Sequence, residues 1–538
     1  MSKKLFALLA LALVLVMSVS AFGEYYSYNY ASGLPLTEET VTFSILLEPS
    51  DSTADYDTNY LTMAIEEACN VKFEFSYLPK GEAYTKLSAM LASGQKLPDI
   101  ICLGLGINDV QAFANNGSIL PIEEYLEDCP NFNAICEQYP EAQVRERITA
   151  ADGHIYGLPY VAWVDQCWEN QWVNREWMEK AGVTEVPTTA EEFYDMLVAF
   201  KNCDFNGNGE ADEYYPIIGN YTDADATILP WIMNNFEYWH GKDYMNVKDG
   251  EVYPAFTTEA YKEGIKFIIK LFDEGLIDPQ VFTMTWGQMM GLVESAEVPY
   301  AVFGNMSPRR NDEYTVLNPF ATKFTNGLTA HRSPSVDPIW FVTRDCKNPE
   351  LAVKISDYMF TTDMGMELLY RFGVEGEQWG RVTEENINEL NIRNFFGQES
   401  TFYIIVDDQW GVNKNGEMPN MHWKRCHPCF YYNLEDYRGW TSDFLDPRYT
   451  TYMEGVMDNL KYRPEVGTYV DFIIMNEEET TLYNEIRTEL ISYVEEMFTA
   501  FCSKNVDIDT EWDNYLATLD TLRLDEFVEV VQGAYDRL

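Results

Sequence analysis

The sequence predicts an α/β protein with more than one domain, and three observations support this. The chain is 538 residues long, which exceeds the usual size of one domain. Hydrophobic residues make up 46% of it and aromatic residues 15%, enough for large cores. Near its start, strand-like and helix-like segments alternate in the order β-α-β-α-β, which is typical of a largely parallel sheet covered by helices.

The elements of this first α/β segment follow from periodicity and from turn residues. They are a strand at 41–47, a helix at 58–69, a strand at 71–77, a helix at about 81–93 and a short buried strand at 99–102. Gly94 is a suitable residue to end the second helix. Ligands of such sheets bind beyond the carboxyl ends of the strands. The loop after the first strand, Glu48 to Asp51, is therefore a candidate ligand-binding element.

Further helices are expected later in the chain. Thr189 and Glu192 form a capping box that opens a helix through Phe200. An amphipathic helix is predicted at 259–274, and another begins at Pro349. The last hundred residues read as strongly helical and acidic.

The N-terminus has the pattern of a signal peptide. Two lysines precede an apolar run from Leu5 to Met17, and Val19-Ser20-Ala21 is a small-residue cleavage pattern. The apolar run is too short for an ordinary membrane-spanning helix. We therefore expect residues 1–21 to be removed and the remaining chain to be exported, with an uncleaved anchor as the alternative.

The strongly negative charge of the chain disfavours anionic partners. The formal net charge is −50, so nucleic acid and anionic membranes are poor partners. The same charge favours a neutral or cationic ligand over an anionic one, although acidity can also serve solubility alone.

The ten cysteines give a weak signal. An even number in an exported protein permits disulfides, but a large chain does not need them. Cys426-His427-Pro428-Cys429 has redox or zinc spacing, yet it lacks a second pair. A local disulfide or two free thiols is the expected state, and a zinc enzyme is not.

The sharpest local motif is the segment Asp204 to Glu213, in which oxygen-bearing side chains alternate with glycines. Oxygen side chains stand at its first, third and fifth positions and Gly209 at its sixth, as at the start of an EF-hand loop. The twelfth position is Tyr215 instead of glutamate, so a complete EF-hand is disfavoured. The loop predicts a structural calcium ion, and the alternative is a metal-free surface turn. The expected ligands are Asp204, Asn206, Asn208, the Glu210 carbonyl, Asp212 and Glu213.

Several segments carry a resemblance to a known family. They are 97–100, 155–160, 172–183, 187–193, 204–213, 372–376 and the ending from 512 to 535. Together and in this order they resemble bacterial extracellular solute-binding protein family 1, in its large, calcium-containing branch. That branch serves carbohydrate ABC importers and includes alginate-oligosaccharide binders and LplA-like lipoproteins.

This resemblance implies a periplasmic-binding-protein-like fold of type II, with two α/β lobes, a hinge, an interlobe ligand cleft and a helical C-terminal region. The expected parts are 22–158 with roughly 335–400 as lobe 1, 159–334 as lobe 2, and 401–538 as a mainly helical part packing on the lobes. The implied protein is a monomer that delivers a carbohydrate, expected to be an oligosaccharide, to a membrane permease. It has no catalytic residues. One departure is Phe22, which stands where a lipoprotein would carry its anchoring cysteine.

Sugar sites need aromatic platforms surrounded by polar side chains. For each single tryptophan of this chain, packing in a core is the competing role. The ligand-binding candidates are Glu48, Asp51, Trp231, Trp286, Trp340 and Arg371.

Two alternatives stay open from sequence. A secreted glycoside hydrolase would use similar aromatic platforms with a pair of carboxylates. A binding protein of the same fold could instead take a peptide or another nutrient. No serine-hydrolase elbow, zinc-protease helix or P-loop occurs in the chain.

Overall fold

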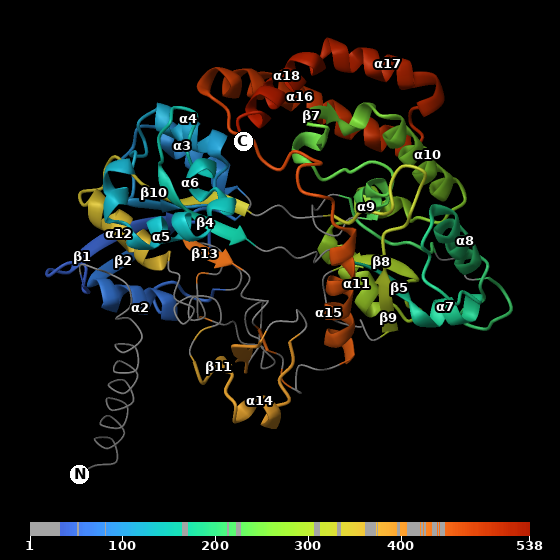
Figure 1. The fold of residues 1–538 in the computed structure, drawn as a ribbon, viewed down its shortest axis with the longest axis horizontal. Coiled ribbons are helices and arrows are strands. Elements are labelled where there is room, and N and C mark those ends of the chain that lie inside the picture. Colours follow the sequence, from blue (N-terminus) through green and yellow to red (C-terminus); the bar gives the residue numbers. More distant parts are fainter. Residues whose placement is uncertain are drawn as a thin grey trace. The chain divides into compact units, whose positions relative to one another are not determined.

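The structure is a computed structural model (Figure 1). It describes residues 33–50, 53–80, 82–163, 170–211, 215–221, 228–305, 313–330, 335–360, 373, 375–394, 399–405, 420, 423, 427–432, 438–439, 441 and 447–538. The chain divides into two compact units, Met1–Val164 with Pro334–Thr441 (unit 1) and Asp165–Ser333 with Ser442–Leu538 (unit 2). The predicted signal peptide at 1–21 lies outside the described residues. Within them, no helix combines the length and the apolar character needed to cross a membrane.

Unit 1 is built on a six-stranded sheet in the order β13-β4-β10-β3-β1-β2. The strands are β1 (Val41–Leu47), β2 (Val71–Tyr77), β3 (Ile100–Cys102), β4 (Gly157–Trp163), β10 (Ser335–Val342) and β13 (Cys429–Tyr432). Only β10 runs against its neighbours, and the other five strands point the same way. The carboxyl ends of those five strands therefore lie at one edge of the sheet, which we call the carboxyl edge.

Helices cover both faces of this sheet (Figure 1). On one face, Phe43, Ile45 and Leu47 of β1 belong to a core shared with α2 (Tyr60–Cys69), α5 (Pro130–Gln138) and α12 (Pro349–Met359). On the other face, Leu46 belongs to a core shared with α3 (Ala83–Ala92) and α4 (Ile107–Asn115). The alternation of β1 side chains between two cores gives the three-layer α/β arrangement.

The predicted elements of this unit are confirmed with small shifts at their ends. Strands 41–47 and 71–77 match β1 and β2. The predicted helix at 58–69 begins at Tyr60, because the Asn59 side chain caps it by accepting from the Leu61 N–H at 3.0 Å. The third strand begins at Ile100, because the Asp99 carboxylate accepts hydrogen bonds from the N–H and hydroxyl of Ser44.

A second, three-stranded sheet belongs to unit 1. It has the order β11-β12-β14, formed by β11 (Trp379–Arg381), β12 (Phe402–Ile404) and β14 (Arg438–Gly439), with the short helix α14 (Asn386–Glu389) nearby in sequence. Unit 1 also holds the one-turn helix α6 (Val144–Arg147). The three strands of this second sheet therefore fold with the N-terminal part of the chain.

Unit 2 has a three-stranded sheet in which β5 (Asn170–Asn174) lies between β8 (Val302–Asn305) and β9 (Tyr314–Leu317), antiparallel to both. β6 (Met245–Lys248) and β7 (Glu251–Pro254) form a hairpin that is a separate two-stranded antiparallel sheet. The helices are α7 (Arg175–Ala181), α8 (Ala190–Lys201), α9 (Ile228–Asn234), α10 (Glu259–Asp273), α11 (Trp286–Ser295) and α15 (Pro447–Asn459). The capping box of Thr189 and Glu192 is confirmed at the start of α8.

Three helices end the chain: α16 (Glu477–Cys502), α17 (Ile508–Thr521) and α18 (Leu524–Tyr535). Their apolar side chains share one core with α8, α9 and α10. An ion pair of 2.7 Å between Arg487 and the buried Asp243 carboxylate joins α16 to the segment before β6. The C-terminal helices are therefore an integral part of unit 2.

The two units differ from the predicted lobes in two places. The predicted boundary after residue 158 falls inside β4, which stays in unit 1 because it pairs with β10 and β13. The region 401–538, predicted as one helical part, is divided between the units. Residues 401–441 supply β12, β13 and β14 to unit 1, and the helices from α15 onward belong to unit 2.

Candidate functional site

The oxygen-rich loop follows α8, and its side chains fold back on its own backbone. The Asp204 carboxylate accepts from the N–H groups of Gly207, Asn208 and Gly209 at 2.8–3.0 Å. The Asn206 side chain accepts from Asn208 N–H at 3.0 Å, and the Asn208 side chain from Glu210 N–H at 2.8 Å. These bonds tie three oxygen-bearing side chains to the backbone of one tight turn.

Two glycines make this turn possible. Gly207 and Gly209 have φ angles of +75° and +95°, which are unfavourable for residues with a Cβ atom. The loop therefore forms the tight, glycine-containing turn that the sequence predicted.

The donor set of the loop fits a hard cation. Asp204, Asn206 and Asn208 offer only oxygen, the donor atom that calcium takes. The other two predicted side-chain ligands, Asp212 and Glu213, lie outside the described residues. Over the described residues, no three His, Cys, Asp or Glu side chains form a metal-binding group. In this loop, two of the three described ligand candidates, Asn206 and Asn208, carry amide and not carboxylate oxygens.

The loop is anchored to unit 2 through Phe205, its second residue. The buried Phe205 ring stacks on Trp177 of α7, with centroids 4.5 Å apart. Lys180 donates to the Phe205 carbonyl at 2.5 Å and lies over the same ring at 4.1 Å. Trp177 in turn donates to the Pro299 carbonyl at 2.7 Å. The loop therefore starts from a residue that is packed in the core of unit 2.

The predicted ligand-binding residues fall at several places. Glu48 follows β1 and lies half-buried at the carboxyl edge of unit 1. Asp51 and Arg371 lie outside the described residues. Trp286 is the first residue of α11, and its side chain is not among those described.

Trp231 lies in the core of unit 2, and Trp340 lies in one of the two cores of unit 1. Trp340 is 1% exposed and donates its indole N–H to the Ala352 carbonyl at 3.0 Å. Trp231 is 3% exposed and meets the rings of Phe193 and Phe320 at 5.8 and 5.5 Å. Their ring faces are covered by the protein, so in this conformation neither can stack on a sugar. Core packing was the competing role for each tryptophan.

Two aromatic residues that we did not select from the sequence stand out at the carboxyl edge. Tyr77 ends β2 and is 50% exposed, and Tyr84 lies in the first turn of α3 and is 46% exposed. The rule that placed Glu48 at the site applies equally to residues after the second strand. The sequence therefore held a usable signal for both tyrosines.

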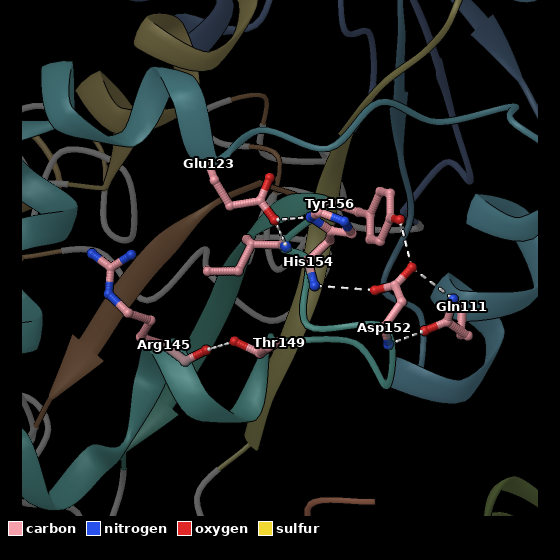
Figure 2. A network of polar contacts seen from close by, with 8 residues as sticks. Gln111, Glu123, Arg145, Thr149, Asp152, His154 and Tyr156 are labelled. Atoms are coloured by element: carbon pink, nitrogen blue, oxygen red, sulfur yellow. Dashed lines mark hydrogen bonds and ion pairs between the residues drawn. The ribbon is translucent and has the colours of Figure 1, made fainter. Parts of the chain in front are cut away.

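Helix α4, which follows β3 at this edge, is fixed by a polar network shown in Figure 2. The Gln111 side chain donates to the Asp152 carboxylate at 2.9 Å and accepts from the Asp152 N–H at 3.0 Å. Tyr156 donates its hydroxyl to the same carboxylate at 2.7 Å. This network joins the middle of α4 to the loop before β4.

The electrostatics of the network favour an ionised Asp152. Burial by itself raises its pKa, but the hydrogen bonds from Gln111, Tyr156 and the His154 N–H outweigh that effect and lower the pKa overall. Beside it, Glu123 accepts from Ile155 N–H at 2.6 Å and lies 2.9 Å from His154 Nδ1 (Figure 2). The carboxylates of Asp152 and Glu123 thus both accept hydrogen bonds from backbone N–H groups of the loop 152–155.

The described cysteines form no disulfide with one another. They are Cys69, Cys102, Cys129, Cys136, Cys203, Cys346, Cys429 and Cys502. In the Cys426–Cys429 motif, Cys426 lies outside the described residues. His427 is buried, and burial lowers its pKa to about 4, so it is neutral at physiological pH.

Comparison with known proteins gives a consistent result along the whole chain. FusA, a fructooligosaccharide ABC transporter substrate-binding protein of Streptococcus pneumoniae serotype 4, is 26% identical over 98% of this chain and 97% of its own. A solved structure of FusA with kestose matches with a TM-score of 0.73 at 23% identity, covering 92% of this chain and 99% of that one. Another structure of the same protein is an EF-hand mutant with fructo-nystose.

Two further solved structures share the fold. A solute-binding protein of Bifidobacterium longum infantis, named as HMO-binding and ABC-transporter-associated, matches with a TM-score of 0.74 at 20% identity, over 93% of this chain and 99% of that one. Alginate-binding protein AlgQ2, solved without calcium ion, matches with a TM-score of 0.66 at 18% identity, over 93% and 99%. These likenesses confirm the predicted α/β fold of a solute-binding protein with a helical C-terminal region.

The family itself is shown by a direct match. Residues 51–366, more than half of the chain, match the family described as bacterial extracellular solute-binding protein. Members of this family bind solutes and are not enzymes, in agreement with the prediction that the chain has no catalytic residues. The chain therefore belongs to the family of bacterial extracellular solute-binding proteins.

Proposed function

We propose that this protein is the solute-binding component of an ABC importer and that it captures an oligosaccharide for a membrane permease. The observation that carries the proposal is the similarity to FusA, which runs over 98% of this chain and 97% of that one. Similarity over nearly all of both sequences supports a shared role more strongly than a match to one domain.

Unit 1 has features that suit a sugar. Its carboxyl edge combines exposed tyrosine rings with carboxylates, and sugar rings present apolar faces and hydroxyl edges that such groups recognise. Ligand binding would favour whichever conformation makes the better contacts, and the permease would read that conformation. The interlobe cleft, the monomeric state and the export of the chain stay predictions of the sequence.

We also propose that the loop beginning at Asp204 holds a structural calcium ion. The support is an oxygen-only donor set on a glycine turn, together with the existence of an EF-hand in the related FusA. Asp204, Asn206, Asn208, the Glu210 carbonyl, Asp212 and Glu213 would hold the ion. A bound calcium ion would cross-link the loop.

A ligand screen tests the transport function. The calcium-loaded protein is heated with mono- and oligosaccharides and with peptides, and each sugar is recovered for mass spectrometry. A ligand at a hundred times its dissociation constant adds about 2.7 kcal/mol of stability, which a thermal shift detects. We expect stabilisation by oligosaccharides that are recovered intact. Cleaved sugar would indicate a glycoside hydrolase, and stabilisation by peptides alone would refute the carbohydrate assignment.

A further inference from the structure

We propose that the carboxyl edge of unit 1 is a binding subsite for uncharged oligosaccharides, with Tyr77 and Tyr84 as its aromatic platforms. The inference rests on the proposed function, that the protein binds a sugar. It adds to that function the residues of one subsite and the charge class of the ligand.

Tyr77 is a supported aromatic ring with an open side. Its ring centroid lies 5.8 Å from that of Tyr56, which is buried and whose hydroxyl accepts a hydrogen bond from the Ser50 N–H at 3.0 Å. Tyr56 packs in turn on Phe75 at 5.5 Å. Tyr77 itself is 50% exposed. One side of the residue is therefore backed by the core, and the remainder can contact the apolar face of a sugar ring.

Tyr84 is supported in the same way on the other side of the sheet. Its ring lies 5.8 Å from Phe113 of α4, and its hydroxyl hydrogen-bonds to Asp109 in the first turn of that helix. Gln111, two residues after Asp109, is bound to Asp152 (Figure 2). The network of Figure 2 therefore fixes the helix that orients Tyr84.

The topology brings both tyrosines to the same edge. Strands β1, β2 and β3 are parallel, so the segments that follow them emerge together. Tyr77 ends β2, Glu48 follows β1, and Asp109 lies in the helix that begins after β3. Leu78 N–H still bonds to the Leu47 carbonyl at 2.8 Å, which keeps the segment after β2 beside the end of β1.

The charge of this edge selects the ligand. The described residues of segments 48–59, 77–84 and 103–109 contain one cation, Lys80. They contain five carboxylates: Glu48, Asp55, Asp57, Glu82 and Asp109. Ionised carboxylates accept hydrogen bonds from sugar hydroxyls, but they repel a sugar that carries its own carboxylate. This balance favours neutral oligosaccharides over uronates.

Burial and the nearby carboxylates raise the pKa of both tyrosine hydroxyls. Burial, then the charges of Asp57 and Asp55, raise the pKa of Tyr77. Burial, then the hydrogen bond to Asp109, raise the pKa of Tyr84. Both hydroxyls are therefore neutral at physiological pH, and the rings remain polarised but uncharged surfaces.

The test compares two sugars on one set of variants. Kestose is the neutral probe and trigalacturonate the anionic one, and both are titrated into the calcium-loaded protein by calorimetry. We expect kestose to bind and trigalacturonate to bind at least about tenfold more weakly. Tyr77→Leu and Tyr84→Leu, which keep apolar bulk, should each weaken kestose binding by about tenfold. The pair Asp57→Asn and Asp109→Asn should narrow the difference between the two sugars.

Tyr125→Leu is the matched control. Tyr125 also bonds its hydroxyl to a carboxylate, that of Glu124. It lies in the short helix Glu123–Asp128, which follows the bridge between Ile119 and Thr343 beyond the end of β10. Because β10 is reversed, that is the opposite edge of the sheet, and kestose binding should be unchanged. Thermal unfolding of each variant confirms that it is folded.

Two results separate this inference from the proposed function. Tight binding of kestose that is unaffected by both tyrosine variants, or tighter binding of trigalacturonate, would overturn the subsite while leaving an oligosaccharide-binding protein. Failure to bind any oligosaccharide would overturn the proposed function, and this inference with it.

Discussion

The ring of Phe205 lies stacked on Trp177, with centroids 4.5 Å apart and an angle of 27° between the planes. Phe205 is the second residue of the oxygen-rich loop, and Trp177 belongs to the core of unit 2. This contact joins the loop to the core of the unit.

Replacing Phe205 with alanine should destabilise the protein and weaken the loop's affinity for calcium. The buried ring leaves a cavity beside Trp177, and such truncations cost about 3 kcal/mol. Urea unfolding with and without calcium measures both effects. An unchanged calcium affinity would mean that the loop is ordered independently of its anchor.

Calcium binding should depend on the side chain of Asp204 and not on that of Glu210. The Asp204 carboxylate organises three backbone N–H groups and would also bind the ion, so Asp204→Ala should abolish binding. Glu210 would contribute only its carbonyl, so Glu210→Ala is the matched control and should bind nearly as well. Calcium titration by calorimetry distinguishes the two. Equal loss in both variants would refute the ligand assignment.

Removal of calcium by a chelator should lower the melting temperature of the protein. An ion that binds the folded chain and not the unfolded one stabilises it by mass action, about 2.7 kcal/mol at a hundred times its dissociation constant. The Asp204→Ala variant should show no such shift. A chelator effect of equal size in that variant would place the responsible metal elsewhere.

The Asp152 network should make stability depend on acid pH. Because hydrogen bonds lower the pKa of Asp152 in the folded state, its contribution is present above the unfolded pKa, about 3.9, and is lost as the pH falls through the lower folded value. Because Asp152 is exposed and water screens its bonds, Asp152→Asn should cost no more than about 1 kcal/mol at pH 7, and this difference should shrink below about pH 4. Unfolding free energies of both proteins across pH 3–7 measure it. A difference that stays constant down to pH 3 would contradict this account.

Asp357 is a fully buried carboxylate of unit 1, and its removal should destabilise that unit. It lies in α12 and accepts from the N–H groups of Asn131 and Phe132 at 3.3 and 2.7 Å, capping the start of α5. Asp357→Ala should cost about 2 kcal/mol, because it leaves those N–H groups buried without an acceptor. Asp357→Asn retains one acceptor and should cost less. Equal losses in urea unfolding would argue against the capping role.

Local sequence signals predicted local structure well. The alternation around Phe43 and Phe73 placed β1 and β2, and the Thr189 capping box placed the start of α8. The glycines of the oxygen-rich loop predicted a tight turn that the structure contains. In each case the signal and the structure involve residues close together in sequence, so the physics is contained in the pattern.

Long-range relationships were harder to predict. Trp340 looks like a sugar platform by composition, but its burial depends on Trp423 and Ala352, which are distant or on another element. The assignment of β4 and β13 to unit 1 likewise depends on the pairing of β4 with β10 and of β13 with β4. A single sequence does not record which strand pairs with which, so the tryptophan roles and the unit boundaries could not be read from it.

The most direct test of the central claim is a calorimetric titration of the calcium-loaded protein with kestose and nystose, with mass spectrometry of the recovered sugar. We predict saturable binding of one molecule per chain, with each oligosaccharide recovered intact. Absence of heat with these and other oligosaccharides, or recovery of cleaved products, would contradict the account of the protein as an oligosaccharide-binding component of an importer.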